Sequence, residues 1–338
     1  MQRTPVRMRD LAEAVGVSVM TVSRAFKSDK SVNEETRKKI LQVAQDLGYV
    51  FDSTAANLRT QTTNFVAVII PSINNANFAD TVGAMSDNLS EAGMQVLLGY
   101  SGYNVAKEEE LIAQLLRRKP DAIVVTGGRH SPAARKMLLN AGIPVVETWD
   151  LPPDPINHVV GFSNAETMHG LVDHIVKSGR TRIAFIGGDS NDDTRGADRR
   201  RGFLAAMERH GLDATRLVGA GQTPISMLQG AQSMAQILDE MPDTEAVIGV
   251  SDLVAFGALT ECQRRGVRVP DDISIAGFGA YDISSVSHPT LTTVDPRAQM
   301  IGTETARLIM RLLDMKPNIL PEHEVIKIDW SIRPAQSG

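Results

Sequence analysis

The sequence predicts an all-α N-terminal segment followed by a larger α/β body of two doubly wound, parallel-sheet subdomains. Residues 8–47 hold three short windows in which apolar residues recur at helical spacing. From Phe65 onward, short β-branched runs alternate with longer helical windows, a pattern typical of parallel sheets with helices on both faces. Residues 50–63 form a polar, Thr-rich connector between these regions. A chain of 338 residues is also too long for one core, so several domains are expected.

The first two helical windows are joined by a tight turn and have the pattern of a helix-turn-helix. The first helix is predicted from Met8 to Val15, and Gly16 supplies the turn. Ser18 is a suitable N-cap for the second helix, because its hydroxyl can accept a hydrogen bond from an orphan backbone N–H. The outer face of the second helix carries Met20, Ser23, Arg24 and Lys27. This mixture suits a DNA major groove, although an ordinary solvated helical hairpin would have the same spacing.

A third helix is predicted from about Asn33 to Leu47. Asn33 is a good N-cap, and Gly48 follows the last turn, where glycine is favoured. Three short helices with a helix-turn-helix at the front predict a DNA-binding headpiece over residues 1–49 and a hinge over residues 50–63.

The charge of the chain is divided in a way that fits this headpiece. The whole chain carries a net charge of −5. Residues 1–63 contain ten lysines and arginines against seven aspartates and glutamates, a net charge of +3 that leaves −8 for the remainder. Any attraction to phosphates is therefore confined to the N-terminal segment.

Composition excludes several classes of protein. The hydrophobic content of 42% and the charged content of 22% are ordinary for a soluble globular chain. No apolar run approaches the ~20 residues needed to cross a bilayer, and residues 1–5 do not resemble a secretory leader. The single cysteine, Cys262, excludes an internal disulfide framework and is expected to be a small buried side chain. We therefore expect a cytoplasmic protein with no membrane partner.

The motifs of the N-terminal segment follow a specific order. They are Asp10-Leu-Ala12, Gly16-Val-Ser18, Thr21-Val-Ser-Arg24, Val32, Thr36-Arg37 and Leu47-Gly-Tyr49. This order resembles the headpiece of the lactose-repressor family of transcription regulators. The resemblance implies that Val19, Met20 and Arg24 reach base edges, while Thr21 and Ser23 contact phosphates. It also implies a homodimeric repressor with two headpieces on a palindromic DNA operator.

The connector at residues 50–63 matches the hinge of the same family. The resemblance implies a short helix that orders on the operator and inserts Leu58 into the minor groove, with Ala55 and Asn57 beside it. A wedge of this kind kinks the duplex at a cost in base stacking. A plain linker, in which Leu58 only touches the body, would have the same composition. The family usually has proline where this chain has Phe51, which bears on the stiffness of the connector rather than on its role.

The body is predicted to contain two similar α/β halves. The predicted strands are 66–70, 95–98, 122–126, 145–148, 159–162, 183–186, 217–218, 246–250 and 273–277. The predicted helices are 78–92, 107–118, 131–141, 166–178, 199–210, 225–238 and 254–265. In doubly wound sheets, ligands bind at the carboxyl ends of the strands. The two halves resemble periplasmic sugar-binding proteins as well as the regulator family, and the resemblance covers essentially the whole chain.

The resemblance also sets the expected division of the body, residues 64–338. The chain is expected to cross back into the first half near Thr292, which makes 300–313 a helix of the N-terminal subdomain. The last strand, 324–328, is expected to return to the second half. The expected subdomains are about 64–161 with 292–320, and about 162–291 with 321–338.

Candidate effector contacts follow the strands and face the cleft between the halves. The resemblance implies that Phe78 packs on the effector, that Arg199 binds it, and that Asp252 lies near the hinge of the cleft. Tyr100 and Trp149 follow later strands, where each could stack on a ligand or simply pack. The core of the next helix would equally explain Phe78, and a solvated run of charges would explain Arg199.

Two departures from the family pattern bear on the effector. Gly279 stands where many members carry an acid, and Ser163 stands where many carry an aspartate. Those carboxylates normally hold sugar hydroxyls. Their absence, with Arg199 and Arg297 nearby, favours an anionic ligand, because a carboxylate pairs bidentately with arginine. Residues 261–264 and Asp282-Ile283 resemble the gluconate-regulator branch, so the expected effector is a sugar or sugar acid such as gluconate.

The chain offers no recognisable catalytic motif. It contains no phosphate-binding loop, nucleophile elbow, H-E-x-x-H or C-x-x-C motif. No enzyme, cofactor or metal site is therefore expected. The alternative to a regulator is a soluble sugar-binding or sugar-modifying α/β protein whose N-terminal helices serve only as a dimer contact. Such a protein would lack the salt-dependent DNA affinity of a phosphate-binding headpiece.

Overall fold

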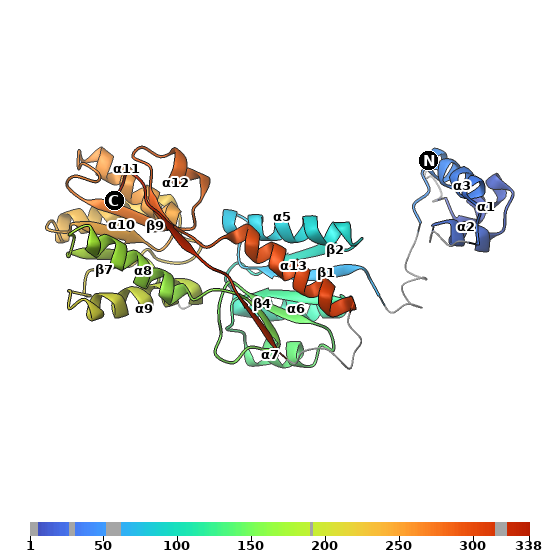
Figure 1. The fold of residues 1–338 in the computed structure, drawn as a ribbon, viewed down its shortest axis with the longest axis horizontal. Coiled ribbons are helices and arrows are strands. Elements are labelled where there is room, and N and C mark those ends of the chain that lie inside the picture. The colour runs from blue at the N-terminus through green and yellow to red at the C-terminus, as the bar shows by residue number, and fades with distance from the viewer. Residues whose placement is uncertain (1–5, 27–30, 52–61, 190–191, 315–322) are drawn as a thin grey trace. The chain divides into compact units, whose positions relative to one another are not determined.

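The computed structural model of the protein describes residues 6–26, 31–51, 62–189, 192–314 and 323–338. It contains two compact units, Met1–Thr63 and Asn64–Gly338. The first unit is helical and the second is α/β, as predicted (Figure 1). The boundary between the units lies at the predicted start of the body.

The described part of the first unit contains three helices, α1 (Met8–Val15), α2 (Val19–Phe26) and α3 (Glu34–Leu47), which confirms the predicted headpiece elements. Gly16 ends α1 in the left-handed conformation (φ 80°), which glycine adopts without a Cβ penalty. Ser18 Oγ caps α2 by accepting a hydrogen bond from the Thr21 N–H at 3.1 Å. Asn33 caps α3 through the Thr36 N–H at 2.7 Å. The buried core of this unit consists of Leu11, Ala12, Val15, Val22, Ala25, Val32, Ile40 and Ala44.

An aromatic cluster ties Phe51 to the second helix. The Phe51 ring stacks on Phe26 of α2 with ring centroids 4.9 Å apart and planes 15° from parallel. Tyr49 meets the same Phe26 ring at 5.8 Å. Aromatic pairs of this kind contribute about 0.5–1.5 kcal/mol beyond the area they bury. Phe51, at the position where the family usually has proline, is thus fixed by stacking on α2 rather than by a locked backbone torsion.

The first subdomain of the body is a parallel sheet with the strand order β11-β5-β4-β3-β1-β2. Its strands are β1 (Phe65–Ile70), β2 (Gln95–Tyr100), β3 (Ala122–Thr126), β4 (Val145–Thr148), β5 (His158–Gly161) and β11 (Glu324–Lys327). Its helices are α5 (Ala76–Glu91), α6 (Val105–Leu116), α7 (Pro132–Leu139) and α13 (Ala298–Asp314). Helices α5 and α13 lie together over one face of the sheet, and α6 and α7 cover the other (Figure 1).

The second subdomain is a sheet with the strand order β12-β10-β9-β8-β6-β7. Its strands are β6 (Ile183–Ile186), β7 (Leu217–Val218), β8 (Ala246–Gly249), β9 (Ser274–Phe278), β10 (Thr292–Asp295) and β12 (Ser331–Arg333). Its helices are α8 (Asn164–Lys177), α9 (Thr194–Arg209), α10 (Met227–Glu240), α11 (Asp252–Arg264) and α12 (Asp282–Val286). Strand β12 runs antiparallel to β10, and the other described pairs are parallel. The doubly wound architecture is therefore confirmed in both halves.

The crossings between the subdomains differ from the prediction in two places. Strand β10 pairs with β9 in the second sheet, so the chain crosses back only after Asp295 rather than near Thr292. Strand β11 pairs with β5 in the first sheet, so the predicted return of 324–328 to the second half is wrong. It is β12 that returns to the second sheet. Alternating strand and helix patterns predict that a strand exists, but its pairing partner depends on long-range packing. Helix α13 does belong to the first subdomain, as predicted, where it packs on α5.

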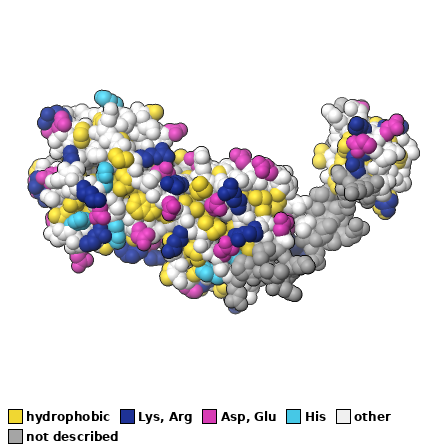
Figure 2. Space-filling model, in the orientation of Figure 1, with side chains coloured by type: hydrophobic (Ala, Val, Ile, Leu, Met, Phe, Trp, Pro, Cys, Tyr) yellow, Lys and Arg dark blue, Asp and Glu magenta, His cyan; other side chains and the backbone are white. Residues whose placement is uncertain are grey.

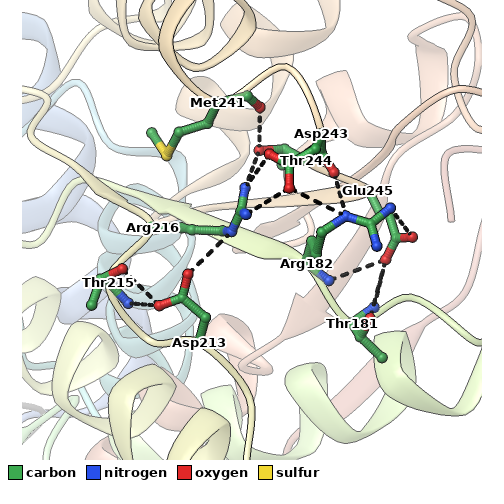
Figure 3. A network of polar contacts seen from close by, with 9 residues as sticks. All are labelled: Thr181, Arg182, Asp213, Thr215, Arg216, Met241, Asp243, Thr244 and Glu245. Atoms are coloured by element: carbon green, nitrogen blue, oxygen red, sulfur yellow. Dashed lines mark hydrogen bonds and ion pairs between the residues drawn. The ribbon is translucent and has the colours of Figure 1, made fainter.

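A polar network holds the amino ends of the second sheet (Figure 3). The Arg216 guanidinium donates to both carboxylate oxygens of Asp243, at 2.9 and 2.8 Å. Arg182 pairs with Glu245, whose carboxylate also accepts the Thr181 N–H at 2.8 Å. Bidentate pairs that form a network resist fraying better than isolated surface ion pairs do. The network fixes the loops at the amino ends of the strands. A cavity lies at the opposite end of the sheet, beside the carboxyl ends of the strands.

The surface of the body mixes both signs of charge. On the face shown in Figure 2, basic and acidic side chains are interspersed among polar and apolar ones. A single-sign field that would attract nucleic acid is not visible on this face of the body.

Candidate ligand cavity and nucleic-acid interface

A cavity of about 250 Å³ lies between the two subdomains of the body. The first subdomain lines it with residues that follow β1, β2 and β4, among them Asn75, Phe78 and Trp149. The second subdomain lines it with residues that follow β6, β7 and β8 and with the end of β9. The cavity thus lies at the carboxyl ends of both sheets, the expected place for a ligand in doubly wound folds.

Several helices begin at this cavity. Among the described lining residues, Asn75, Asp193, Ser226 and Ser251 are the N-caps of α5, α9, α10 and α11. Each side chain accepts a hydrogen bond from a backbone N–H in the first turn of its helix. The amino ends of helices carry partial positive charge. Their convergence favours a ligand with negative charge or with electron-rich oxygens.

An aromatic wall forms the side of the cavity that belongs to the first subdomain. Phe78 and Trp149 are 4% and 3% exposed, and their rings meet edge to face at 5.3 Å. Trp149 adopts φ 69°, an uncommon left-handed conformation for a tryptophan. The Asn164 side-chain amide donates to the Trp149 carbonyl at 3.0 Å and helps to hold it. The buried indole N–H of Trp149 has no hydrogen-bond partner among the described residues, which leaves a donor for a ligand.

Arg199 lines the opposite side of the cavity, in the second turn of α9. Its Nε donates to the Arg195 carbonyl at 3.2 Å, and its Nη1 donates to the Val250 carbonyl at 3.0 Å. The guanidinium lies 4.1 Å from the centre of the Phe278 ring. Burial lowers the pKa of Arg199, with Asp193 opposing that effect. All these partners belong to the second subdomain. Helix α9 begins at Thr194, so the prediction that Arg199 starts this helix is wrong.

Arg195 also lines the cavity and was missed from the sequence. It lies one turn before Arg199 on the same face of α9. It is 5% exposed, and its Nη1 donates to the Thr126 carbonyl of the first subdomain at 3.3 Å. The guanidinium lies 5.6 Å from the centre of the Phe78 ring. The signal in the sequence is Asp193, a good N-cap, which would have started the helix early enough to place both arginines on one face.

Charge in the cavity is unbalanced toward the positive. Arg195 and Arg199 donate to backbone carbonyl oxygens, and within the described part of the chain neither forms an ion pair. The acid among the described lining residues is Asp193, whose Oδ1 accepts the Gly196 N–H at 3.1 Å. Burial raises the pKa of Tyr103, another lining residue, and Asp193 adds to that rise. Two buried cations against one acid leave room for one negative charge on a ligand.

Two residues predicted to bind the effector do not line the cavity. Tyr100 is 45% exposed and lies under the ammonium of Lys107, which is 3.9 Å from its ring centre. Arg297 is exposed, and its backbone N–H donates to Asp295 Oδ1 at 2.8 Å. Tyr100 is the last residue of β2 and Arg297 follows β10, but neither side chain is among those that line the space between the subdomains. The structure therefore brings together Phe78, Trp149 and Arg199 from the predicted set.

Asp252 and Gly279 lie behind the cavity, where they shape the loop that carries Tyr281. Asp252 is fully buried, accepts the Tyr281 N–H at 2.8 Å, and accepts the Thr293 hydroxyl at 2.6 Å. Burial raises the pKa of Asp252 to about 6, although these hydrogen bonds oppose the rise. Gly279 adopts φ 132°, and a Cβ there would lie 2.5 Å from the Tyr281 ring. Tyr281, which lines the cavity, was not predicted.

The helix-turn-helix presents the predicted DNA-binding face. Val19 and Met20 are 45% and 62% exposed on α2. Arg24 is exposed, and Thr21 and Ser23 are half-buried. Exposed apolar side chains at the start of a helix after a tight turn fit contact with thymine methyl groups in a major groove. The predicted hinge residues Ala55, Asn57 and Leu58 lie outside the described residues.

The described ranges hold neither a helix suited to a bilayer nor a cluster of metal-binding side chains. None of the helices found there is long and apolar enough to cross a membrane. The same residues contain no group of three or more His, Cys, Asp or Glu side chains arranged to hold a metal ion. Cys262 is a free, buried thiol, and burial raises its pKa to about 12.

A helix-turn-helix unit joined to a two-subdomain receptor body defines a class of regulators in which a ligand site and a DNA-binding unit share one chain. Comparison with known proteins makes the assignment specific. Residues 7–52 match the family model of bacterial regulatory proteins of the lacI family, and residues 172–334 match the periplasmic binding protein-like domain. The chain belongs to the lacI family of bacterial regulatory proteins and is a DNA-binding transcriptional regulator.

Two curated relatives and one solved structure cover most of the chain. The HTH-type transcriptional regulator GntR of Pseudomonas aeruginosa is 33% identical over 90% of this chain and 89% of its own length. The regulator of the same name in Escherichia coli is 32% identical over 92% and 93%. The crystal structure of a lacI-family regulator from Silicibacter pomeroyi matches with a TM-score of 0.90 at 31% identity, covering 98% of this chain and 99% of that chain. The alternative of a sugar-binding protein without DNA binding is therefore wrong.

Proposed function

We propose that this regulator senses a small anionic sugar derivative, a sugar acid such as gluconate, in the cavity between its subdomains. The observation that carries the proposal is the pair of buried guanidiniums, Arg195 and Arg199, that line one cavity without an ion pair among the described residues. A carboxylate forms charge-assisted hydrogen bonds with arginine that are roughly twice as strong as neutral ones. A bound carboxylate would thus give an ionic partner to two guanidiniums that donate hydrogen bonds to neutral carbonyl oxygens.

The rest of the cavity suits the polyol part of such a ligand. Asn74, Asn75 and Asn77 bring amide groups, and Trp149 brings an N–H that has no partner among the residues described. The volume of about 250 Å³ is below the roughly 300–1,000 Å³ typical of pockets for drug-sized ligands, which favours a single sugar unit. Gly279, which lies behind the cavity, and Ser163 carry no charge, so neither position adds a carboxylate that would repel an anion.

We further propose that the chain acts as a homodimeric repressor on a palindromic operator. Its headpiece would comprise residues 1–49 and its hinge residues 50–63. Val19, Met20 and Arg24 would read base edges, while Thr21 and Ser23 would hold phosphates. Leu58, flanked by Ala55 and Asn57, would enter the minor groove from each hinge. Effector in the cavity would favour a body arrangement in which the two hinge helices cannot form together, which releases the operator.

Calorimetry with matched ligands tests the effector. Gluconamide has the same polyol chain as gluconate, and glucose has a similar size. Of the three compounds, only gluconate carries a carboxylate. We expect gluconate to bind at least about tenfold more tightly than either neutral compound, a difference of about 1.4 kcal/mol. Equal or tighter binding of gluconamide or glucose would contradict the proposal. Selection of genomic DNA fragments by the full-length protein, with and without gluconate, then identifies the operator and the sign of the response.

A further inference from the structure

Arg195 connects the two subdomains, whereas Arg199 does not. Arg195 stands on α9 of the second subdomain, and its Nη1 reaches the carbonyl of Thr126 at the end of β3 in the first subdomain. Its guanidinium also lies beside Phe78, which belongs to α5 of the first subdomain. Arg199 has the same charge and lines the same cavity, but it binds Val250 and stacks on Phe278 within its own subdomain.

The first subdomain is shaped to receive this guanidinium. Gly127, which follows Thr126, adopts φ 93°, and a Cβ at that position would lie 2.6 Å from Arg195 Nη1. Any other residue would therefore push the guanidinium away from the Thr126 carbonyl. Thr126 itself is held in place, because its hydroxyl donates to the Ile69 carbonyl at 3.0 Å. The bond across the cleft thus joins two well-fixed partners.

The Thr126 carbonyl is a weaker partner for Arg195 than a carboxylate would be. A carbonyl oxygen is neutral, while a carboxylate accepts two parallel, charge-assisted hydrogen bonds from one guanidinium. Arg195 lines the cavity with the same side chain that reaches Thr126. Since Nη1 is the atom that reaches Thr126, a carboxylate in the cavity that engages this Nη1 competes with the Thr126 carbonyl for it.

We propose that Arg195 transmits the charge of the effector to the relative position of the two subdomains, by exchanging the Thr126 carbonyl for the carboxylate of the effector. This inference rests on the proposed anionic effector. A ligand shifts a conformational equilibrium only through contacts that differ between the two states. On this proposal the Arg195–Thr126 bond is such a contact, because it is present in this arrangement and would be lost once the carboxylate engages Nη1. Arg199 anchors the ligand in both arrangements and so adds affinity without adding coupling.

The test measures operator affinity with and without saturating gluconate for the full-length protein and its variants. The DNA is a fragment recovered by genomic selection, and the readout is the ratio of the two operator Kd values. We expect gluconate to change the operator Kd of the unmodified protein at least about tenfold. In Arg195→Gln we expect gluconate still to bind, but to change the operator Kd less than about twofold. In Arg199→Gln we expect saturating gluconate to change the operator Kd by the same factor as in the unmodified protein. Saturation should require about 10- to 100-fold more gluconate.

The outcomes separate this inference from the proposed function. If gluconate does not bind the unmodified protein, the proposed effector is wrong. If gluconate binds and Arg195→Gln keeps the full ratio, the coupling role of Arg195 is wrong. Loss of all gluconate binding in Arg195→Gln, with binding retained in Arg199→Gln, would also overturn it, because Arg195 would then be the main anchor. Arg195→Lys keeps the positive charge but loses the planar guanidinium that can donate two parallel hydrogen bonds. We therefore expect the ratio of operator Kd values to lie between those of Arg195→Gln and the unmodified protein. This variant carries the test if thermal melting shows that Arg195→Gln is unfolded.

Discussion

The two walls of the cavity are built from different chemistry. The first subdomain lines it with amide, hydroxyl and aromatic side chains, and none of its described lining residues is charged. The second subdomain supplies Asp193, Arg195 and Arg199, the charged residues of the described lining. The wall of the first subdomain thus offers stacking and neutral hydrogen bonds, and the wall of the second subdomain offers charged groups that can pair with a charged ligand. A ligand with an anionic end and a polyol chain satisfies both walls only when it spans them, which links binding to the position of the subdomains.

Arg199→Gln removes a charge from the charged wall and has the largest expected effect. The variant should bind gluconate about 10- to 100-fold more weakly, because a buried hydrogen bond to a charged group contributes about 1.5–3 kcal/mol. Isothermal calorimetry measures the change. The matched control is Arg201→Gln on the same helix, where the side chain is 70% exposed and pairs with Asp198. Equal losses in the two variants would show that overall charge, rather than this wall, attracts the ligand.

Trp149→Phe alters the neutral wall and should have a smaller effect. The substitution keeps a ring but removes the indole N–H that lacks a partner among the described residues. One neutral hydrogen bond contributes about 0.5–1.5 kcal/mol, so gluconate affinity should fall about 2- to 12-fold while the melting temperature changes little. Trp330→Phe is the control, since Trp330 packs against Gly170 and does not line the cavity. Unchanged gluconate affinity in Trp149→Phe would show that the indole N–H does not contact the ligand.

The first subdomain does bury charge, but outside this cavity. His130 Nδ1 lies 2.5 Å from Glu108 Oε1, and its Nε2 lies 3.6 Å from Glu147 Oε1. Burial alone would lower the pKa of His130, but hydrogen bonds and the charges of the two carboxylates outweigh it and raise the pKa to about 9. The folded state therefore holds a proton that an unfolded histidine, with a pKa near 6.5, releases. This contribution to stability is complete below about pH 6.5 and is lost as the pH rises through 9.

Denaturant unfolding at several pH values between 6 and 9.5 checks this prediction. The free energy of unfolding should fall across that range in the unmodified protein and should vary less in His130→Gln. Gluconate affinity of His130→Gln at pH 7 should stay close to that of the unmodified protein, because the cluster does not line the cavity. Parallel pH curves for the two proteins would assign the loss of stability to other groups.

Arg297→Gln should have the smallest effect. The side chain is exposed and is not part of the described lining, although it was predicted as a second cation beside an anionic effector. Loss of this charge should change gluconate affinity less than about twofold at physiological salt, where charges more than about 8 Å apart in solvent are largely screened. A loss comparable to that of Arg199→Gln would extend the charged wall beyond the cavity.

The sequence predicted elements better than their contacts. Periodicity and capping residues located the headpiece helices, because Ser18 and Asn33 act within one turn of the chain. The pairing of β11 with β5 depends on residues more than 150 positions apart, and no local pattern encodes it. The site shows the same division. Phe78 and Arg199 could be placed by resemblance and Trp149 by its position after a strand, whereas Arg195 required knowing where α9 begins.

Asp252 shows a related limit of sequence reasoning. The resemblance made it a candidate effector contact near the hinge of the cleft, but in the structure both carboxylate oxygens hold Thr293 and the Tyr281 loop. Whether a polar side chain faces a cavity or the loop behind it depends on the backbone path of a distant segment. That path is set by tertiary packing, in this case by the tight approach of Gly279 to Tyr281.

A crystal structure of the protein with gluconate would test the central claim most directly. The account predicts that the carboxylate lies against Arg195 and Arg199 of the second subdomain, with the polyol chain toward Trp149 and the asparagines that follow β1. It also predicts that Arg195 no longer donates to the Thr126 carbonyl. A carboxylate placed against the asparagines, with the Arg195–Thr126 bond intact, would contradict it.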